Sequence, residues 1–351
     1  MMGSVRRRGG GSKKIFMKIQ LIHDFKDIIS AENFLEAWKE FARGKRGRVD
    51  VQDFSFGLMD SILELRADLI NHKYVHGGYE AFNISDPKPR DIHKASVRDR
   101  VVHHALYRVL YPFFDRTFIA DSFSCRLGKG THKALRRFAS FVNKASRNDT
   151  RTCWVLKCDI RKFFANIDHE ILLHILARYI SDSNVLWLLW QVIDSFHTEG
   201  KLSVGLPLGN LTSQLFVNVY MNEFDQFVKH RLKAKYYLRY ADDFAILSHD
   251  KKRLAEHIPL IEDFFRAKLR LELHPDKVFI KTLASGVDFL GWVNFPRYRV
   301  LRTATKRRMF KRLKDSSKEQ SRASYFGMLT HGNAYKLSRK IEENSGSINL
   351  L

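Results

Sequence analysis

Two adjacent aspartates are the most distinctive polar feature of the second half of the chain. Asp242 and Asp243 lie between two short runs, residues 236–240 and 244–247, that are rich in aromatic and aliphatic residues. This pattern predicts a β-hairpin with both acids at its tip. Neighbouring carboxylates repel each other, and a nearby cation relieves the repulsion. A simpler interpretation stays open, because aspartate is also common in turns that bind no metal.

A third acid strengthens the metal interpretation. Asp159 follows the apolar run 153–156, which predicts a strand that ends just before it. The ends of adjacent strands can bring three carboxylates together. Three carboxylates and substrate phosphates can hold two Mg²⁺ ions about 4 Å apart, the arrangement of two-metal phosphoryl transfer. One ion would activate an attacking 3′-hydroxyl and the other would stabilise a pyrophosphate leaving group.

The elements that must position these acids can be predicted from periodicity. Apolar spacing predicts helical structure over 31–75 and 100–114, and long helices over 211–232 and 254–269. A further helix is expected to begin near Asp168 as its N-cap. Strands are predicted at 278–280 and 287–293, and the last fifty residues are basic and helical. The order of helices, then interleaved strands and helices, then helices indicates an α+β fold.

Positive charge is concentrated in three parts of the chain. The formal net charge of the 351 residues is +23, and residues 1–16, 86–150 and 301–340 contribute +5, +8 and +10 of it. Three basic segments around a balanced centre indicate a framework that binds phosphates at several points, although any one of them could be a solvated face. Residues 1–16 are Gly-rich and are predicted to be a basic flexible tail.

Several function classes are excluded by composition. No run of about 18 apolar residues is present, so we expect no membrane span and no membrane partner. The three cysteines, Cys125, Cys153 and Cys158, are too few for a disulfide framework or a four-ligand zinc site, which favours a reducing compartment. His103 and His104 are helical neighbours that do not face together, and His169 shows no ligand spacing.

The segments around the three acids resemble reverse transcriptases. YADD at 240–243 is similar to their YxDD motif, and Asp159 with Phe163 and Phe164 resembles their motif A. Other motifs of the family follow in the same order between about residues 86 and 340. They are KPR at 88–90 and RDR at 98–100 (first fingers motif), SCRLGKG at 124–130 (second fingers motif), GLPLGNLTSQ at 205–214 (motif B), HPDK at 274–277 (motif D) and FLGW at 289–292 (motif E). One such tetrapeptide alone is weak evidence for the resemblance, whereas several in the order of the family are strong evidence.

The segment that resembles motif B narrows the subfamily. Retroviral and group II intron enzymes mostly have Gln before the glycine of this motif and Pro after its serine. Here Leu208 precedes Gly209, and Gln214 follows Ser213. LGNLTSQ is similar to the reverse transcriptases of diversity-generating retroelements, whose C-terminal region also resembles YFGMLTHGNAYK at 325–336. The resemblance implies error-prone copying of a template RNA into cDNA, with errors at template adenines, followed by replacement of a variable repeat in a target gene (mutagenic retrohoming).

The resemblance also implies roles at the reaction centre. Asp159, Asp242 and Asp243 would be catalytic metal ligands, with Ile160 in the same metal site. Two Mg²⁺ ions would be the cofactors, and Mn²⁺ a possible substitute. Lys277 would protonate the pyrophosphate leaving group, unless it is a solvated surface lysine.

Further roles concern the substrates. Phe164, five residues after Asp159, would be the steric gate that excludes a ribose 2′-hydroxyl, or would simply pack in the core. Gly209 would let a nucleotide or template backbone pass close, because it has no side chain. Gln214 would contact the template base or the incoming nucleotide. The candidates for the triphosphate oxygens are Lys88, Arg90 and Arg126, and those for the primer grip are Phe289, Leu290, Gly291 and Trp292.

The implied architecture is a right-hand polymerase. Residues 17–150 would form an N-terminal helical region and the fingers, 151–285 the palm, and 286–351 the primer grip and a short helical thumb. The partners would be template RNA, a primer or cDNA, dNTPs and a pentameric RNA-binding accessory protein. The location would be the cytoplasm, for a bacterial, archaeal or phage-encoded protein.

Two other functions remain open on the sequence. One is a retron-like or antiviral-defence reverse transcriptase. The other is a non-catalytic RNA-binding protein on the same scaffold, against which the three acids argue, since RNA binding alone does not need carboxylates that face phosphates.

Overall fold

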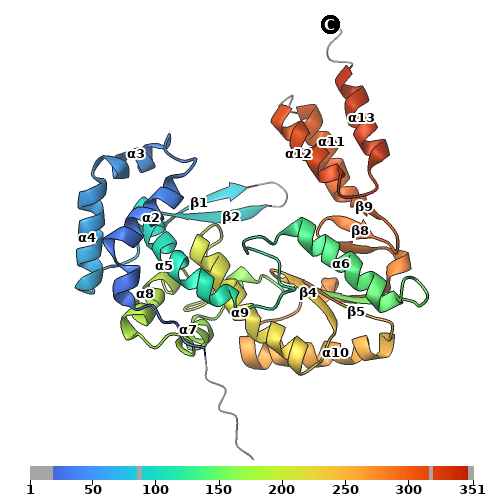
Figure 1. Cartoon of the computed structure of the whole chain (residues 1–351), viewed down its shortest axis with the longest axis horizontal. Coiled ribbons are helices and arrows are strands. Elements are labelled where there is room, and N and C mark those ends of the chain that lie inside the picture. The colour runs from blue at the N-terminus through green and yellow to red at the C-terminus, as the bar shows by residue number, and fades with distance from the viewer. Residues whose placement is uncertain (1–18, 85–88, 316–318, 347–351) are drawn as a thin grey trace, which may run out of the picture.

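Helices and antiparallel sheets alternate along the chain in the order that the sequence predicts. The computed structural model describes residues 19–84, 89–315 and 319–346. The predicted tail 1–16 and Lys88 lie outside the described residues. Figure 1 shows one group of helices on one side of the molecule, a sheet with flanking helices on the other, and three C-terminal helices above a small sheet. The fold is therefore of the α+β class.

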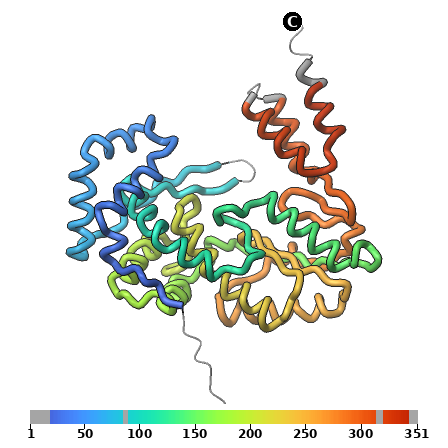
Figure 2. Tube along the Cα trace, in the orientation of Figure 1, coloured from blue at the N-terminus to red at the C-terminus, as the bar shows by residue number. Residues whose placement is uncertain are grey.

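The N-terminal helices form the first part of the core. They are α1 (Phe25–Ile28), α2 (Ala31–Ala42), α3 (Val49–Phe56) and α4 (Leu58–Ile70), followed by the long helix α5 (Val97–Asp115). The Ser30 side chain caps α2 by accepting a hydrogen bond from the backbone N–H of Asn33. Phe34, Trp38 and Phe41 lie on one face of α2 and are buried, as their spacing predicts. Figure 2 shows the segment before α1 running beside a part of the chain that comes much later in the sequence, where Leu21 N–H donates to Tyr179 O over 2.8 Å.

A four-stranded antiparallel sheet lies at the centre of the other half. Its strands, in the order β4-β5-β3-β6, are Tyr236–Tyr240, Asp243–Ser248, Trp154–Cys158 and Phe279–Thr282. Alternate residues face opposite sides. Leu156 and Phe244 belong to the core shared with α9 (Leu211–His230) and α10 (Lys251–Phe264), whereas Val155 and Ala245 belong to the core under α6 (Thr131–Ser146). The sheet is thus the middle layer of three.

A second hairpin and two short helices complete the region between the helical side and the sheet. The hairpin pairs β1 (Tyr79–Ile84) with β2 (Arg90–Ala95). Helix α7 (His169–Ala177) begins where predicted, and the side chain of its N-cap Asp168 accepts a hydrogen bond from Ile171 N–H. Helix α8 (Ser183–Ile193) follows it. The helix predicted to end at residue 269 does so with a π-helical turn, Phe265–Leu269.

The prediction of a single strand over 287–293 was wrong. The segment is a tight hairpin of β7 (Val287–Phe289) and β8 (Trp292–Asn294), which pairs further with β9 (Arg299–Leu301). Leu290 and Gly291, at the turn, both have positive φ, 52° and 83°. Two consecutive residues with positive φ define a two-residue hairpin turn, for which the glycine is the only signal in the sequence.

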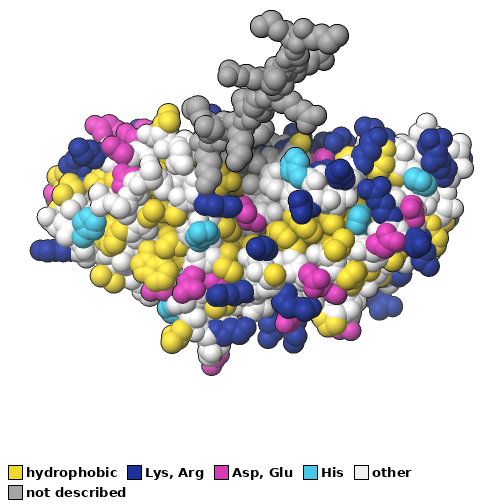
Figure 3. Space-filling model, turned by 90° about the horizontal axis from the view of Figure 1, so that it is seen from below, with side chains coloured by type: hydrophobic (Ala, Val, Ile, Leu, Met, Phe, Trp, Pro, Cys, Tyr) yellow, Lys and Arg dark blue, Asp and Glu magenta, His cyan; other side chains and the backbone are white. Residues whose placement is uncertain are grey.

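Three helices follow the small sheet, as the basic helical pattern predicts. They are α11 (Thr303–Asp315), α12 (Glu319–Leu329) and α13 (Tyr335–Gly346). Among the described residues, no helix is both long and apolar enough to cross a membrane. On the face drawn in Figure 3, Lys and Arg side chains are interspersed with acidic and hydrophobic ones instead of forming one continuous patch. The remaining short elements are 3-10 turns at Phe164–Asn166, Pro275–Lys277 and Leu283–Ser285.

Candidate active site

Strand pairing brings the three predicted acids to one edge of the central sheet. Cys158, the last residue of β3, pairs with Phe244 of β5, so that Asp159 follows directly at the level of Asp243. Asp242 lies in the turn between β4 and β5, next to Ala241, which has a φ of +55°. The predicted hairpin with acids at its tip is confirmed. Asp159 and Asp243 have the same strand parity as Val155 and Ala245, and therefore lie toward the α6 side.

The electrostatics of the acids show that they lie close together. Burial raises the pKa of Asp243 to about 6, and the charges of Asp242 and Asp159 add to the shift. Burial also raises the pKa of Asp242, with Asp159 as the next cause. Burial and neighbouring negative charge both disfavour the ionised form. The site therefore accumulates negative charge that a cation would stabilise.

Two lysines approach these acids. Lys157, two residues before Asp159 on β3 and largely buried, places its Nζ 2.9 Å from Asp243 Oδ1. This pairing partly opposes the upward shift in the pKa of Asp243. Lys277, in a 3-10 turn, donates to Asp159 Oδ1 over 3.2 Å. Lys277 was singled out in the sequence and Lys157 was missed, although its strand parity with Asp159 was a usable signal.

The donor set suits Mg²⁺. Carboxylate oxygens are the ligands that this ion prefers, usually together with water and substrate phosphates. Asp243 Oδ1 is buried and faces the Lys157 ammonium at 2.9 Å, so that an ion bound by this oxygen would share it with Lys157. The side chain of Ile160 is apolar and fully buried, and only its backbone carbonyl oxygen could contribute a further ligand.

The loop that resembles motif B lies against strand β2 of the β1–β2 hairpin. Gly209 has a φ of +104°, and a Cβ built there would lie 2.7 Å from Ile92 Cγ2 of β2. Asn210 Nδ2 donates to His93 O over 2.9 Å. Gln214, in the first turn of α9, lines a cavity of ≈ 390 Å³ together with Ile92 and Gly209. A residue with a side chain at Gly209 would push this loop and β2 apart.

Phe164 lies where the chain leaves the acids. It begins a 3-10 turn, is partly buried and meets the ring of Phe163 edge-on at a centroid distance of 5.7 Å. Its carbonyl oxygen accepts a hydrogen bond from Leu206 N–H over 2.8 Å, which ties this turn to the 205–210 loop. Phe163 is buried and Phe164 is only partly buried, so that Phe164, the candidate gate, is the more accessible of the two rings.

The basic candidates for phosphate binding differ in availability. Arg90 is exposed at the start of β2, and its charge slightly opposes the rise in the pKa of Asp242 that burial causes. The guanidinium of Arg126 instead bonds within the fold. It pairs with Asp115 over 2.6 Å and donates to the backbone carbonyls of Asp115, Ile119 and Ser122. Lys88 lies outside the described residues.

The four residues of the predicted primer grip occupy the β7–β8 turn. Phe289 is buried and stacks on Phe138 of α6 at a centroid distance of 5.2 Å. Trp292 is buried against Gly332, where an added Cβ would lie 2.0 Å from Trp292 Cζ3. Leu290 and Gly291 form the turn itself. The hairpin is thus fixed between α6 and the C-terminal helices.

A buried ion pair supports the acid hairpin and was missed in the sequence. Arg239 of β4 is fully buried and pairs with Asp225 of α9 through two hydrogen bonds of 2.8 and 2.7 Å. The same guanidinium donates to Ala241 O over 3.0 Å, which anchors the turn that carries Asp242. No local pattern reveals this pair, because the two residues belong to different elements.

The sequence matches a known family over more than half of its length. The family described as "Reverse transcriptase (RNA-dependent DNA polymerase)" matches residues 85–293. This range contains the three acids, the 205–214 loop and most of the β7–β8 turn. The chain belongs to the reverse transcriptase family, and its fold is the right-hand polymerase fold, with an antiparallel sheet in the palm.

Two of the relatives are bacterial proteins. Protein YkfC of Escherichia coli (strain K12) is 28% identical over 243 residues, which cover 59% of this chain and 63% of that protein. The group II intron-encoded protein LtrA of Lactococcus lactis subsp. cremoris is 25% identical over 219 residues, 60% of this chain and 35% of that protein. The chain thus spans less than two thirds of the length of these relatives.

Among solved structures, telomerase from Candida albicans in complex with a fragment of telomeric RNA aligns with a TM-score of 0.49 and 12% identity. The alignment covers 66% of this chain and 46% of that chain.

Proposed function

We propose that the chain is an RNA-directed DNA polymerase that copies a template RNA into cDNA by two-metal-ion nucleotidyl transfer. The observation that carries this proposal is the convergence of Asp159, Asp242 and Asp243 at one sheet edge. Membership of the reverse transcriptase family supports it. The same convergence argues against a non-catalytic RNA-binding protein, since it concentrates negative charge where a phosphate backbone would pass.

The residues of the chain have distinct roles in this reaction. The three carboxylates would hold Mg²⁺, or Mn²⁺ as a substitute, and the bound ions would activate the primer 3′-hydroxyl and stabilise the pyrophosphate leaving group. Lys277, 3.2 Å from Asp159 Oδ1, is placed to donate a proton to the leaving group. Lys157 holds Asp243 in position, since its ammonium lies 2.9 Å from that carboxylate.

Other residues bind and select the substrates. Arg90, exposed near Asp242, is our candidate for the triphosphate, together with Lys88 from the adjoining segment. Phe164 is the gate against ribonucleotides. Gly209 and Gln214 border the template or nucleotide, and the β7–β8 turn holds the primer. Arg126 would not contact the triphosphate itself. Its guanidinium donates four hydrogen bonds, to Asp115, Ile119 and Ser122, and these hold the 119–127 loop in place.

We further propose that the polymerase belongs to a diversity-generating retroelement. The support is the LGNLTSQ segment at 208–214, whose similarity to these enzymes is closer than to retroviral or group II intron enzymes. The function would then be error-prone cDNA synthesis for mutagenic retrohoming in the cytoplasm. A pentameric RNA-binding accessory protein would be the partner. We assign the fingers to 17–150, the palm to 151–285 and the primer grip with the thumb to 286–351.

Primer extension tests the proposal. The purified chain is given a primed RNA template, dNTPs and Mg²⁺, beside the Asp242→Ala/Asp243→Ala variant, and the products are sequenced. We expect synthesis by the unmodified chain alone, with substitutions concentrated opposite template adenines. Because a missing partner would also suppress synthesis, the assay is repeated with the proteins and RNA encoded beside the gene.

The outcomes separate the levels of the proposal. Equal synthesis by the double variant would refute the metal assignment. Errors spread evenly over the four template bases would refute the diversity-generating assignment and favour a retron-like or defence enzyme. RNA binding without synthesis, even with the neighbouring components present, would refute the polymerase.

A further inference from the structure

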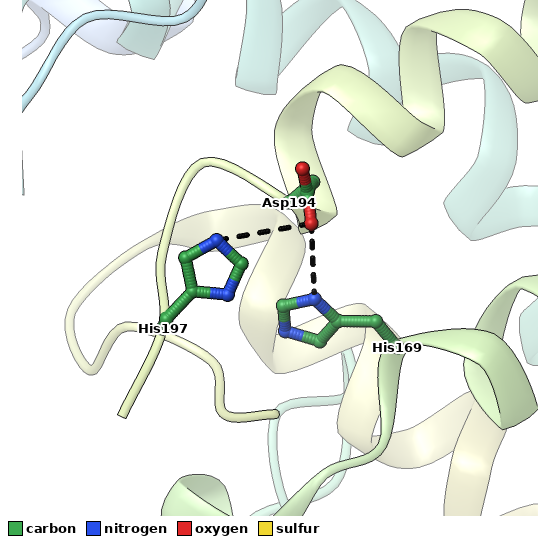
Figure 4. Close-up of side chains that lie close together, drawn as sticks. All are labelled: His169, Asp194 and His197. Carbon is green, nitrogen blue, oxygen red and sulfur yellow. Dashed lines mark ion pairs between the residues drawn. The ribbon is translucent and has the colours of Figure 1, made fainter. Parts of the chain in front are cut away.

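Three polar side chains lie close together where helix α7 begins and helix α8 ends, and the family resemblance assigns no metal-binding role to any of them. They are His169, the first residue of α7, Asp194, the residue after α8, and His197, three residues later (Figure 4). Asp194 Oδ1 lies 3.7 Å from His169 Nδ1 and 3.8 Å from His197 Nε2. All three potential ligand atoms lie within 4.8 Å of one another. The spacing of His169 in the sequence gives no sign of this cluster, because its two neighbours come from a distant segment.

Two of the three separations, 3.7 and 3.8 Å, are close to those of ligands around one ion, and the third is within 4.8 Å. They are too long for hydrogen bonds, which end near 3.2 Å for N–H···O. Ligands at about 2.0–2.2 Å from a tetrahedral ion lie roughly 3.3–3.6 Å from each other. The observed 3.7 and 3.8 Å need only a small contraction to reach this geometry.

The orientation of His169 gives a second, independent indication. Its Nε2 lies 2.7 Å from Gly205 O, and only a protonated nitrogen can make a hydrogen bond to a carbonyl. In the neutral ring Nδ1 then carries a lone pair. The side chain is fully buried, and Nδ1 has no hydrogen-bond partner while it faces the Asp194 carboxylate. Two electron-rich atoms face each other, and a cation between them would remove the repulsion.

A proton on Nδ1 is the simplest such cation, but burial disfavours it. Burial lowers the pKa of His169, although the hydrogen bond to Gly205 and the charge of Asp194 oppose this shift. Neutral imidazole is the form that binds metals. In metal-binding histidines, the ring nitrogen that does not bind the metal usually donates a hydrogen bond, often to a backbone carbonyl, and this bond orients the ring.

We propose that His169, Asp194 and His197 bind a divalent transition-metal ion of the Zn²⁺ type. Two imidazoles and one carboxylate suit Zn²⁺, whereas Mg²⁺ prefers oxygen ligands alone. His197 is partly exposed, with a side-chain exposure of 35%, so the remaining coordination positions face solvent. The site shares no residue with the three-carboxylate centre and needs no polymerase activity.

Binding has a conformational consequence at His197. Its Nδ1 accepts a hydrogen bond from Ser203 N–H over 3.0 Å, so its proton resides on Nε2 in the neutral ring. A metal ion on Nε2 moves this proton to Nδ1, and the hydrogen bond from Ser203 breaks. Ser203 has a φ of +55° and its carbonyl accepts from His169 N–H. Metal binding would therefore remove this one hydrogen bond of the turn, whereas the bond from His169 N–H to Ser203 O involves neither ring nitrogen of His197.

Metal binding by the full chain tests the proposal. The chain is stripped of metal and titrated with Zn²⁺ by calorimetry, in the Asp242→Asn/Asp243→Asn background that removes the competing carboxylates. We expect one Zn²⁺ ion to bind per chain. His197→Ala should weaken the binding of Zn²⁺ at least about tenfold, because replacing a residue that only orients a metal ligand already weakens metal affinity by about 10- to 100-fold. His249→Ala, which removes an exposed histidine elsewhere, is the matched control and should bind as the background does.

Cobalt substitution reports the ligands directly. Co²⁺ bound to two imidazoles and a carboxylate in a tetrahedral site gives strong visible absorption, which His197→Ala and Asp194→Asn should each abolish. Because His169 is fully buried and its replacement endangers folding, the exposed His197 carries the test. Unchanged Zn²⁺ affinity in His197→Ala would overturn the proposal, as would the absence of Zn²⁺ binding in the background protein.

Discussion

Replacing Asp243 by Asn should stabilise the metal-free protein while abolishing synthesis. The pKa of this acid is raised from 3.8 to about 6 in the fold, mainly by burial. The folded chain thus holds its proton more tightly than the unfolded chain. At pH 7.5 both states are ionised, and the ionised carboxylate costs the folded state about 3 kcal/mol, at ~1.36 kcal/mol per pKa unit. Asn removes this cost.

The attraction of the Lys157 ammonium is already contained in this figure, because it is one of the causes of the pKa of Asp243. We expect a gain of about 1–3 kcal/mol, because the Asn amide does not reproduce the protonated acid in every contact. With an unfolding entropy of about 2.1 cal/mol/K per residue, 351 residues convert this into a rise in Tm of roughly 1–4 °C.

The raised pKa of Asp243 also predicts how the difference in Tm between the variant and the parent changes with pH. Below pH 3.8 both states are protonated and Asp243 costs nothing, so the cost appears as pH rises from about 4 and is complete above about 6. The difference in Tm between variant and parent should therefore be largest at pH 7.5 and should fall to about half at pH 5.

Thermal unfolding in buffer with a chelator measures the effect. Asp263→Asn, at an exposed acid of α10, is the matched control and should leave Tm unchanged. Added Mg²⁺ should raise the Tm of the parent and not that of Asp243→Asn. A lower Tm for the variant at pH 7.5 would show that the carboxylate is not destabilising in the fold, and would refute the reasoning.

Three other predictions concern the surroundings of the acids. Phe164→Ala should raise the kcat/KM ratio of ribonucleotides over deoxyribonucleotides by at least about tenfold, whereas Phe163→Leu should lower Tm without this change, as primer extension with each substrate would show. Equal selectivity in both variants would remove the gate role. Gly209→Ala should lower both Tm and primer extension, because φ is +104° and the new Cβ would meet Ile92, with a strain of about 1–3 kcal/mol. Gly78→Ala, in open space, is its control, and equal effects of the two would contradict the close approach. Arg239→Gln should destabilise the chain by about 3–5 kcal/mol in urea unfolding, because it leaves Asp225 buried and unpaired. The Arg239→Gln/Asp225→Asn variant should recover part of this loss, and no recovery would mean that the ion pair is not the cause.

The sequence alone determined the local elements and the order of the site motifs. The hairpin around Asp242 and Asp243 was predictable because two short runs of aromatic and aliphatic residues and the acidic turn between them lie within a dozen residues. The start of α7 was predictable because Asp168 caps it from the adjacent position. The family resemblance rested on the same local strings, and it was confirmed over residues 85–293. The one strand that was wrong, 287–293, contained a turn whose first residue, Leu290, is not typical of positive φ.

Only the tertiary structure decided which polar residues meet. Arg126 resembled a phosphate ligand, but Asp115 and three carbonyls from neighbouring loops engage it. Arg239 was not singled out in the sequence, yet α9 supplies Asp225 as its partner and both residues are buried. His169 acquired Asp194 as a neighbour from 25 positions along the chain, across a helix–helix contact. Such pairings depend on how elements pack, and periodicity within one element carries no information about the partner that covers it.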